Sequence, residues 1–167
     1  MERTAVYAGS FDPVTTGHID IIERSCQHFD RVIVAVVHNV TKMPLFSLDE
    51  RVEMIKEATI HLPNVEIDSF SGLLVNYVVE RQAEVIIRGL RSQSDFEYEM
   101  QLAMMNSHLF ARAETFFIMC RPEYLYISSS GVKEAALLGG NIKGLVPESV
   151  AKRLNEKRIL YQQEKDK

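Results

Sequence analysis

Short runs of β-branched and other apolar residues alternate with longer segments of helical periodicity along most of the chain. Five of these runs predict strands: Thr4–Tyr7, Arg31–Val37, Val65–Asp68, Val85–Ile87 and Thr115–Met119. Four segments between them predict helices: Ile19–His28, Leu48–His61, Leu73–Gln82 and Phe96–Phe110. Nearly continuous apolar strands are typical of a parallel sheet that is covered on both faces. The alternation therefore predicts an α/β fold built on a doubly wound, five-stranded parallel sheet.

Local helix signals agree with this reading. Ser47 and Glu50 have the spacing of a capping box, and Pro147 suits the first turn of a last helix. The segment from about Glu156 onward is rich in charge and is expected to be a tail that frays at its end. Because the chain has 167 residues and no linker or internal repeat, we expect a single domain over residues 1–167.

Charge and cysteine content exclude several classes of protein. With 19 basic and 23 acidic residues, the formal net charge is −4, which argues against a general nucleic-acid binder but not against a small phosphorylated ligand. Cys26 and Cys120 lie far apart among apolar residues, which is typical of buried thiols rather than of a disulfide or zinc site. No apolar run approaches ~18 residues, and the N-terminus lacks a signal-peptide pattern. We therefore expect an unprocessed cytoplasmic protein with no membrane segment.

The loop after the first strand is the first candidate for ligand binding, because parallel sheets bind ligands beyond the carboxyl ends of their strands. Its glycines, Gly9 and Gly17, are eight residues apart, so the loop is neither a dinucleotide fingerprint nor a Walker loop. His18 follows at the start of a helix, where it can donate a hydrogen bond to phosphate. The alternative is that Thr15 or Thr16 caps the helix and His18 has no role. Residue chemistry alone leaves the two about equal.

Cations follow two other strands at the same edge. Lys42 lies in the loop after the second strand, although a single loop lysine is more often merely solvated. Arg88 and Arg91 flank Gly89 directly after the fourth strand. Because arginine forks match phosphate oxygens in bidentate geometry, a surface role is the weaker explanation for this pair.

Two further features stand near helix starts. Glu99 falls inside an apolar stripe with Phe96 and Met100, where a carboxylate is costly unless it meets an arginine or a ligand. The serines at positions 128–130 present hydroxyls and backbone N–H groups at the start of another helix. The alternative is that Ser130 only caps that helix and the other two fill the turn.

Taken together, these segments resemble a known family. Thr15-Thr16-Gly17-His18 matches the TxGH form of the nucleotidylyltransferase signature, and Ile127–Lys133 resembles its ISSSxxK/R partner. Both also resemble the ATP motifs of class I aminoacyl-tRNA synthetases. Further segments occur in family order and at family spacing: Gly9–Pro13, the Lys42 loop, Ile87–Arg91 and Asp95–Gln101. From about Thr4 to Leu154 the chain is similar to the bacterial phosphopantetheine adenylyltransferase family.

The resemblance implies a Rossmann-like nucleotidylyltransferase fold and transfer of AMP from ATP to 4′-phosphopantetheine. The products would be dephospho-coenzyme A and pyrophosphate, within coenzyme A biosynthesis. It also implies Mg²⁺ accompanying ATP, although no carboxylate cluster in the chain would hold the ion without the nucleotide. A homohexamer is implied as well.

Individual roles are carried over from the family's motifs by position. His18 would stabilise the transition state. ATP would contact Ser10, Phe11, His18, Gly89, Leu90, Arg91, Glu99, Tyr124, Leu125, Tyr126, Ile127, Ser128, Ser129 and Ser130. Phosphopantetheine would contact Ser10, Lys42, Leu74 and Arg88. Lys133 keeps the cation of the second motif. Ser10 stands where threonine is common in the family, so the hydroxyl is retained and a methyl group is lost.

The residue types present suit phosphate-to-phosphate transfer without a covalent enzyme intermediate. Neither a cysteine nor a serine is paired with an evident base, and the incoming phosphate is itself a nucleophile. The enzyme need only align it with the α-phosphate and neutralise charge in the transition state. His18, Lys42, Arg88 and Arg91 are suited to that task.

The segment Phe96–Phe110 also predicts self-association. One stripe carries Phe96, Met100, Ala103 and Met104, and a second carries Tyr98, Leu102, Met105 and Leu109. Because a surface helix of a monomer needs only one apolar stripe, the second stripe indicates a further partner. That partner is either another element of the same chain or another subunit.

Two rival functions remain. Another small adenylyl- or cytidylyltransferase of the superfamily is disfavoured by the Arg88–Arg91 and Phe96–Gln101 segments. A non-catalytic nucleotide-binding regulator would not need Lys42 and Arg88 as a second phosphate site. RNA adenylation or tRNA binding is disfavoured by the acidic composition. Pyrophosphate release with ATP plus phosphopantetheine, compared with ATP alone, separates these alternatives.

Overall fold

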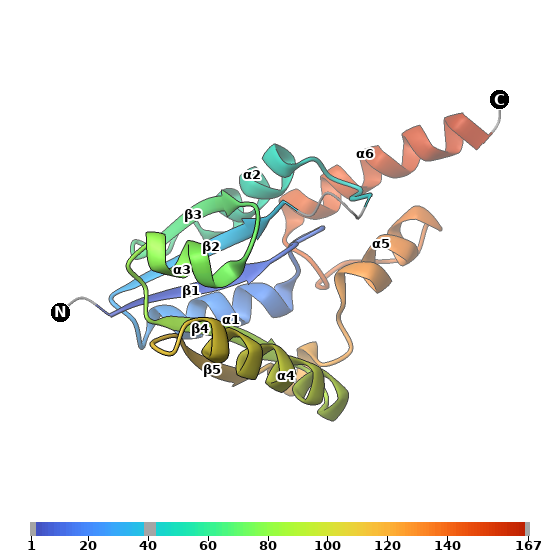
Figure 1. Ribbon diagram of the computed structural model, residues 1–167. Coiled ribbons are helices and arrows are strands. Elements are labelled where there is room, and N and C mark those ends of the chain that lie inside the picture. Colours follow the sequence, from blue (N-terminus) through green and yellow to red (C-terminus); the bar gives the residue numbers. More distant parts are fainter. Residues whose placement is uncertain (1–2, 39–42, 166–167) are drawn as a thin grey trace.

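The computed structural model describes residues 3–38 and 43–165, and its centre is a five-stranded sheet (Figure 1). The strands are β1 (Thr4–Gly9), β2 (Arg31–Val37), β3 (Val65–Phe70), β4 (Val85–Leu90) and β5 (Glu114–Met119). All neighbouring strands are parallel, and their order across the sheet is β3-β2-β1-β4-β5. The predicted doubly wound parallel sheet is confirmed.

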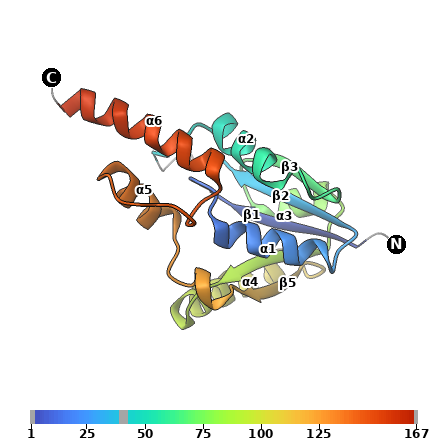
Figure 2. The same ribbon diagram turned by 180° about the vertical axis from the view of Figure 1, so that it is seen from behind.

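Helices cover both faces of the sheet. They are α1 (Thr16–Cys26), α2 (Leu48–Thr59), α3 (Leu74–Glu80), α4 (Gln93–Leu109), α5 (Ser129–Leu137) and α6 (Glu148–Lys165), with a short 3₁₀ turn, η1, at Pro122–Tyr124. Views from opposite sides place α3 and α4 on one face and α1 and α2 on the other (Figures 1 and 2). Within the described residues, no helix combines the length and apolar character needed to cross a membrane.

The two faces of the sheet bury alternate strand residues, as the two-residue period of a strand requires. Ala5 and Tyr7 pack into the core beneath α1 and α2, whereas Val6 and Ala8 pack into the core that α3 covers. Neighbouring strands repeat this alternation, so apolar residues follow one another without interruption in β2. The buried runs in the sequence are therefore the consequence of a sheet covered twice.

The edges of two elements differ from the prediction in ways that matter for the site. Helix α1 begins three residues earlier than expected, because Thr15 caps it, and so His18 lies in its first turn. Strand β4 continues to Leu90, because Leu90 still pairs with Met119 of β5. Arg88 and Gly89 are therefore strand residues, rather than the first residues of a loop.

The C-terminal part departs further from expectation. Ser128, not Ser130, caps α5. Pro147 immediately precedes α6, and its carbonyl accepts a hydrogen bond from the backbone N–H of Ala151. The charged segment from Glu156 is the second half of α6, which extends away from the rest of the chain in Figure 1.

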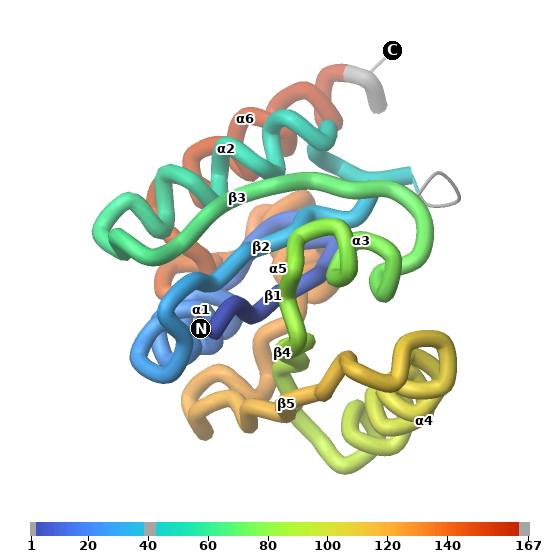
Figure 3. Tube along the Cα trace, turned by 60° about the vertical axis from the view of Figure 1, so that its left-hand side comes forward, coloured from blue at the N-terminus to red at the C-terminus, as the bar shows by residue number. Residues whose placement is uncertain are grey.

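Helix α6 runs beside α2, as Figure 3 shows. Two ion pairs connect the helices. Arg153 contacts Glu57 at 2.6 Å, and Lys157 contacts Glu50 at 2.9 Å. These contacts hold α6 against α2 as far as Lys157, and the rest of the predicted tail continues the same helix away from the domain.

Candidate active site

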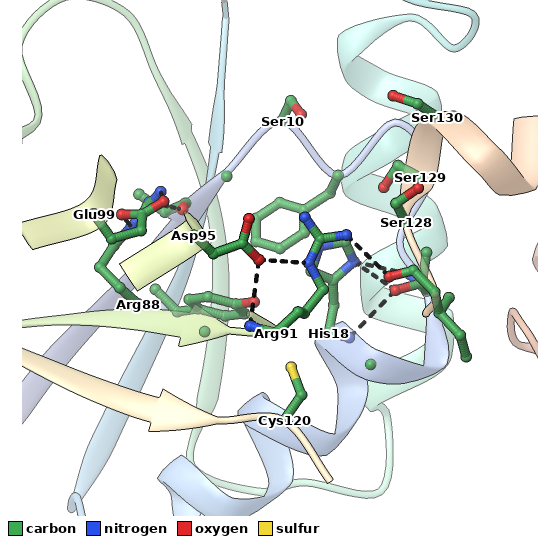
Figure 4. A pocket seen from close by; sticks show the side chains of 18 residues that line it. Ser10, His18, Arg88, Arg91, Asp95, Glu99, Cys120, Ser128, Ser129 and Ser130 are labelled. Atoms are coloured by element: carbon green, nitrogen blue, oxygen red, sulfur yellow. Dashed lines mark hydrogen bonds and ion pairs between the residues drawn. The ribbon is translucent and has the colours of Figure 1, made fainter. Parts of the chain in front are cut away.

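A cavity of about 320 Å³ opens at the carboxyl ends of β1 and β4. These two strands are neighbours in the sheet but not in the chain, so this is the switch point in strand order where such sheets bind ligands. Figure 4 shows Ser128–Ser130 on one side of it, Arg88 and Glu99 on the other, and Arg91 between them. The structure brings together eleven of the predicted residues in its wall: Ser10, Phe11, His18, Arg88, Gly89, Arg91, Glu99, Ile127, Ser128, Ser129 and Ser130.

Other predicted residues lie elsewhere. Leu74 lines two adjoining cavities, of about 150 and 500 Å³, both of which share Arg88 with the central one. Leu90 is buried at the end of β4, and four residues, Leu90 and Tyr124–Tyr126, are not part of the central cavity wall. Lys42 lies outside the described residues.

His18 is held by a capping box at the start of α1. The backbone N–H of Thr15 donates to His18 Nδ1 at 3.0 Å, and the Thr15 hydroxyl lies 3.0 Å from the same nitrogen. The His18 N–H in turn donates to Thr15 Oγ1 at 3.4 Å. Because Nδ1 accepts a hydrogen bond from this backbone N–H, the proton of the neutral imidazole is on Nε2. The sequence left open whether His18 serves the site or whether a threonine caps the helix and His18 has no role. In the structure Thr15 caps the helix, and His18 lines the cavity as well.

The environment of His18 keeps its ring neutral. Burial, together with the positive charges of Arg91 and Arg88, lowers the pKa of His18 to about 4. At neutral pH the residue is therefore a hydrogen-bond donor through Nε2–H and not a cation. This differs from the expectation that His18 helps neutralise charge as the arginines do.

The ring of Phe11 packs against the ring of His18. Its side chain is 2% exposed. The ring contacts His18 and Tyr7 edge-on, with distances between ring centroids of 5.1 Å and 5.4 Å. The Phe11 backbone has φ of +46°, so the loop after Gly9 turns sharply at this residue. Phe11 therefore contributes to the cavity mainly by packing against His18, the catalytic candidate.

The carboxylate of Glu99 meets an arginine. Arg88 Nε and Nη2 donate to the two Glu99 oxygens at 2.5 and 2.6 Å, and Arg88 Nη1 donates to the carbonyl of Ala8 at 2.8 Å. Glu99 thus orients the Arg88 fork from α4 while Ala8 holds it from β1. This bidentate pair explains how a carboxylate can stand within the apolar stripe of a helix.

Arg91 connects β4 to two other segments. Its Nε donates to Asp95 Oδ2 at 3.1 Å, and its Nη1 donates to the carbonyl of Ile127 at 3.2 Å. The arginine therefore ties the first turn of α4 to the loop before α5. Sequence reasoning missed Asp95, although its spacing of four residues from Arg91 was a usable signal.

The three serines do not act alike. Ser128 Oγ accepts from the backbone N–H of Gly131 at 3.1 Å, so it is the cap of α5. Ser129 Oγ donates to the carbonyl of Pro13 at 2.8 Å. Ser129 thus donates its proton within the protein, whereas Ser128 only accepts there and keeps its O–H as a donor, and Ser130 is exposed. What the helix start offers a phosphate is its free N–H groups and the hydroxyls of Ser128 and Ser130.

Cys120 and Tyr7 complete the floor of the cavity and were not predicted as site residues. Burial raises the pKa of the Cys120 thiol, which therefore stays protonated and is a poor nucleophile. Burial likewise raises the pKa of Tyr7. Tyr7 lies within β1 and Cys120 directly follows β5, so the only signal in the sequence was that both are near the carboxyl ends of predicted strands.

Known proteins resemble this chain closely. Curated relatives named phosphopantetheine adenylyltransferase include that of Syntrophomonas wolfei, 60% identical over 94% of this chain and 98% of its own. Those of Desulfatibacillum aliphaticivorans and Carboxydothermus hydrogenoformans are 55% and 56% identical, over 94% and 93% of this chain and 90% and 96% of theirs. The chain belongs to the phosphopantetheine adenylyltransferase family. The model of the cytidylyltransferase-like family matches residues 6–135. The relatives confirm the narrower resemblance drawn from the motifs.

Solved structures agree on the fold. A putative nicotinate-nucleotide adenylyltransferase from Vibrio parahaemolyticus superposes with a TM-score of 0.68 at 18% identity, covering 92% of this chain and 99% of its own. A lipopolysaccharide core biosynthesis protein from Thermoplasma volcanium gives 0.52 at 22% identity, covering 72% and 98%. At such low identity these likenesses establish the shared sheet architecture alone.

Proposed function

We propose that this protein transfers AMP from ATP to 4′-phosphopantetheine in coenzyme A biosynthesis. An oxygen of the phosphopantetheine phosphate forms a bond to the α-phosphorus of ATP. The bond from that phosphorus to the oxygen that bridges to the β-phosphorus breaks, and pyrophosphate leaves. Dephospho-coenzyme A is the other product. The observation that carries this proposal is 53–60% identity to enzymes of this name over nearly the whole chain, joined to a cavity that holds the family's motif residues together.

The ATP side of the cavity is the part between the ends of β4 and β5 and the start of α5. Gly89 lies in the cavity wall there and packs closely against the chain itself, because a Cβ at this position would meet Ile21 at 3.2 Å and the Tyr7 hydroxyl at 3.4 Å. Arg91 provides the cation, and the N-terminus of α5 provides N–H donors for phosphate. Tyr124–Tyr126 lie outside the wall of the central cavity, and their place in this proposal rests on the family motif.

The phosphopantetheine side is formed by Arg88 and the two adjoining cavities. The cavity of about 150 Å³ is lined by Leu74, Leu102, Ala103, Asn106 and Thr115 along with Arg88 and Glu99. The larger one, of about 500 Å³, reaches from Ser10 to Leu74 and Met43. A phosphate held at Arg88 would thus have apolar surface beside it for an extended organic tail. Lys42 belongs to this side of the proposal through its place in the chain just before Met43.

Catalysis would consist of alignment and charge stabilisation. Arg88 and Arg91 are fixed by Glu99 and Asp95, so their forks need little reorganisation when phosphates bind. Neutral His18 would donate Nε2–H to an oxygen of the reacting α-phosphate. Because the nucleophile is already ionised, the chain needs no general base for the attack.

Magnesium fits this site as a part of the nucleotide and not as a resident metal. Among the described residues, no group of three histidine, cysteine, aspartate or glutamate side chains could hold a metal ion. Asp95 and Glu99, the carboxylates in the cavity wall, are paired with arginines. Mg²⁺ would therefore enter on the phosphate oxygens of ATP, whose charge it partly neutralises.

The surface of α4 supports self-association. None of its 17 residues is buried within the described chain. Apolar side chains stand exposed on both predicted stripes, with Met104 at 67%, Tyr98 at 62% and Met105 at 57%. Because such a surface is unusual in a monomer, we propose a closed homo-oligomer, a hexamer as the family resemblance implies. The ATP substrate points to the cytoplasm as its place of action.

The decisive experiment measures pyrophosphate release by the purified protein. ATP with 4′-phosphopantetheine should give sustained release, and ATP alone should give none. Substituting nicotinate mononucleotide for phosphopantetheine, or CTP for ATP, should abolish it. Release with nicotinate mononucleotide but not with phosphopantetheine would indicate another transferase, and nucleotide binding without release would indicate a regulator.

A further inference from the structure

Asp20 is a charged residue of α1 whose side chain is only 3% exposed. A buried carboxylate is costly unless it is paired and hydrogen-bonded. Both oxygens of Asp20 are engaged: Oδ1 lies 3.0 Å from Nε of Arg121, and Oδ2 lies 3.2 Å from Nη1 of Arg24. We refer to Asp20, Arg24 and Arg121 as the Asp20 cluster.

The cluster joins α1 to the segment that follows β5. Arg24 also donates from Nη1 to the carbonyl of Met119, the last residue of β5, at 2.7 Å. Cys120 stands between Met119 and Arg121, and it lines the central cavity. Its backbone N–H donates to the carbonyl of Leu90 at 2.8 Å. The residues on both sides of a cavity-wall residue are therefore held against α1.

From Arg121 a series of hydrogen bonds leads to another part of the cavity wall. The backbone N–H of Tyr124 donates to the carbonyl of Arg121 at 2.9 Å, and that of Ile127 donates to the carbonyl of Tyr124 at 3.0 Å. Ile127 lines the cavity, and its carbonyl accepts from Arg91 at 3.2 Å. The segment therefore starts beside one wall residue, Cys120, and ends at another, Ile127.

The segment belongs to one side of the site only. Residues 119–127, all of which the structure describes, are absent from the walls of the two cavities assigned to phosphopantetheine. They lie instead between the end of β5 and the start of α5, where the ATP side was placed. A change in this segment should therefore affect one substrate more than the other.

The position of His18 has other supports. Thr15 holds the His18 ring through the capping box. Thr16 donates from its backbone N–H and from Oγ1 to the carbonyl of Leu145, both at 3.0 Å. The start of α1 is thus fixed to the connection before α6. Loss of the Asp20 cluster should loosen the segment after β5 and leave the catalytic candidate in place.

We propose that Asp20 is a positioning residue for ATP: through Arg24 and Arg121 it holds residues 119–127 in the conformation that receives the nucleotide. This inference rests on the proposed function. Without the cluster, ATP must order the segment when it binds, and this ordering cost lowers its affinity. Once ATP is bound the site is the same, so the turnover of the saturated enzyme is retained.

The test is the steady-state kinetics of Asp20→Asn, with ATP and phosphopantetheine varied in turn. We expect KM for ATP to rise about tenfold, while kcat and KM for phosphopantetheine change less than about twofold. Arg121→Gln should raise KM for ATP about threefold, because it removes one partly exposed ion pair. Arg121→Lys should keep most of the wild-type affinity, since lysine can reach the same carboxylate.

Two control variants separate this effect from loss of stability. Ile33→Ala removes a fully buried side chain of β2 from the core that α3 covers, so it destabilises the protein without contacting the cluster. Arg153→Gln removes an ion pair between α6 and α2. Measured well below the unfolding temperature of each variant, both should keep the wild-type KM for ATP and for phosphopantetheine.

Should Asp20→Asn fail to fold, Arg121→Gln supplies an independent measurement, because the Arg121 side chain is 55% exposed. The double variant should be no worse than Asp20→Asn alone, since both substitutions remove the same contact. A rise in KM for ATP in Arg121→Gln but not in Asp20→Asn would make Arg121 a direct ligand and overturn the proposal. Equal rises in both KM values would overturn it too.

Failure of the proposed function is distinguishable from failure of this inference. If the wild-type protein releases no pyrophosphate with ATP and phosphopantetheine, the proposed function itself fails. An active wild type whose Asp20 and Arg121 variants show the wrong pattern of KM values overturns only the role of Asp20.

Discussion

The backbone N–H of Thr15 donates to Nδ1 of His18 at 3.0 Å, and this single contact decides which nitrogen of the ring carries a proton. The same residue that begins α1 thus sets the tautomer of the residue we expect to stabilise the transition state. Burial and the charges of Arg91 and Arg88 keep the ring neutral, so Nε2–H is a donor throughout the neutral pH range.

His18→Ala should lower kcat by about 10²–10³ and leave ATP affinity nearly intact, because the donor acts mainly in the transition state. His18→Gln should lose less, since its terminal amide lies near the former position of Nε2. Stopped assays with saturating substrates, together with calorimetry of ATP binding, give both quantities. An alanine variant that keeps half of the wild-type kcat would contradict the assignment.

The ring of His18 should titrate with a midpoint near 4 when followed by NMR, and His18→Gln identifies its signal. Because the folded pKa is depressed below the ordinary 6.5, the unfolded chain takes up a proton between pH 6.5 and 4 that the folded chain does not. The stabilising contribution of this group is therefore fully present above pH 6.5 and is lost as pH falls through that window. A midpoint near 6.5 would contradict the inference that the ring is buried beside Arg91 and Arg88.

Arg88→Ala should raise KM for phosphopantetheine far more than KM for ATP, and Arg91→Ala should do the reverse. The reason is their position, since Arg88 faces the cavities next to Leu74 and Arg91 contacts the loop before α5. Arg112→Ala is the control, because Arg112 is 75% exposed and pairs only with Glu84 among the described residues. Equal effects on both substrates would mean that the two arginines are assigned wrongly.

Met104→Glu should shift the protein from an oligomer to a smaller species in light scattering at micromolar concentration. Met104 is 67% exposed in the isolated chain, so the substitution costs little stability there, but it would place a charge in an apolar contact between subunits. Ile60→Glu, at an 87% exposed position at the end of α2, is the matched control and should leave the mass unchanged. A wild-type species of 19.1 kDa would refute the oligomer.

Chelation by EDTA should abolish pyrophosphate release, and added Mg²⁺ should restore it. The unfolding temperature of the protein without nucleotide should stay the same, because the described residues contain no group of three histidine, cysteine, aspartate or glutamate side chains placed to hold a metal ion. Calorimetric unfolding scans with and without EDTA provide the comparison. A lower unfolding temperature in EDTA would reveal a resident metal site.

Several properties were determined by the sequence alone. The alternation of apolar runs and helical segments was enough for the parallel sheet, and the capping pattern at Ser47 placed the start of α2 correctly. Motif spacing also identified the family. Periodicity, caps and motif order are local properties of the chain, so they can be recognised without knowing which distant residues meet.

Tertiary structure decided the partners and the charge states. Glu99 could have met an arginine or a ligand, and only folding places it on Arg88. Lys133 finds its carboxylate 121 residues away, at Asp12. His18 is neutral because burial and two arginines from β4 and its following loop surround it. Each outcome depends on distances and on exclusion of water between segments remote in sequence, and electrostatic free energies are set by those two quantities.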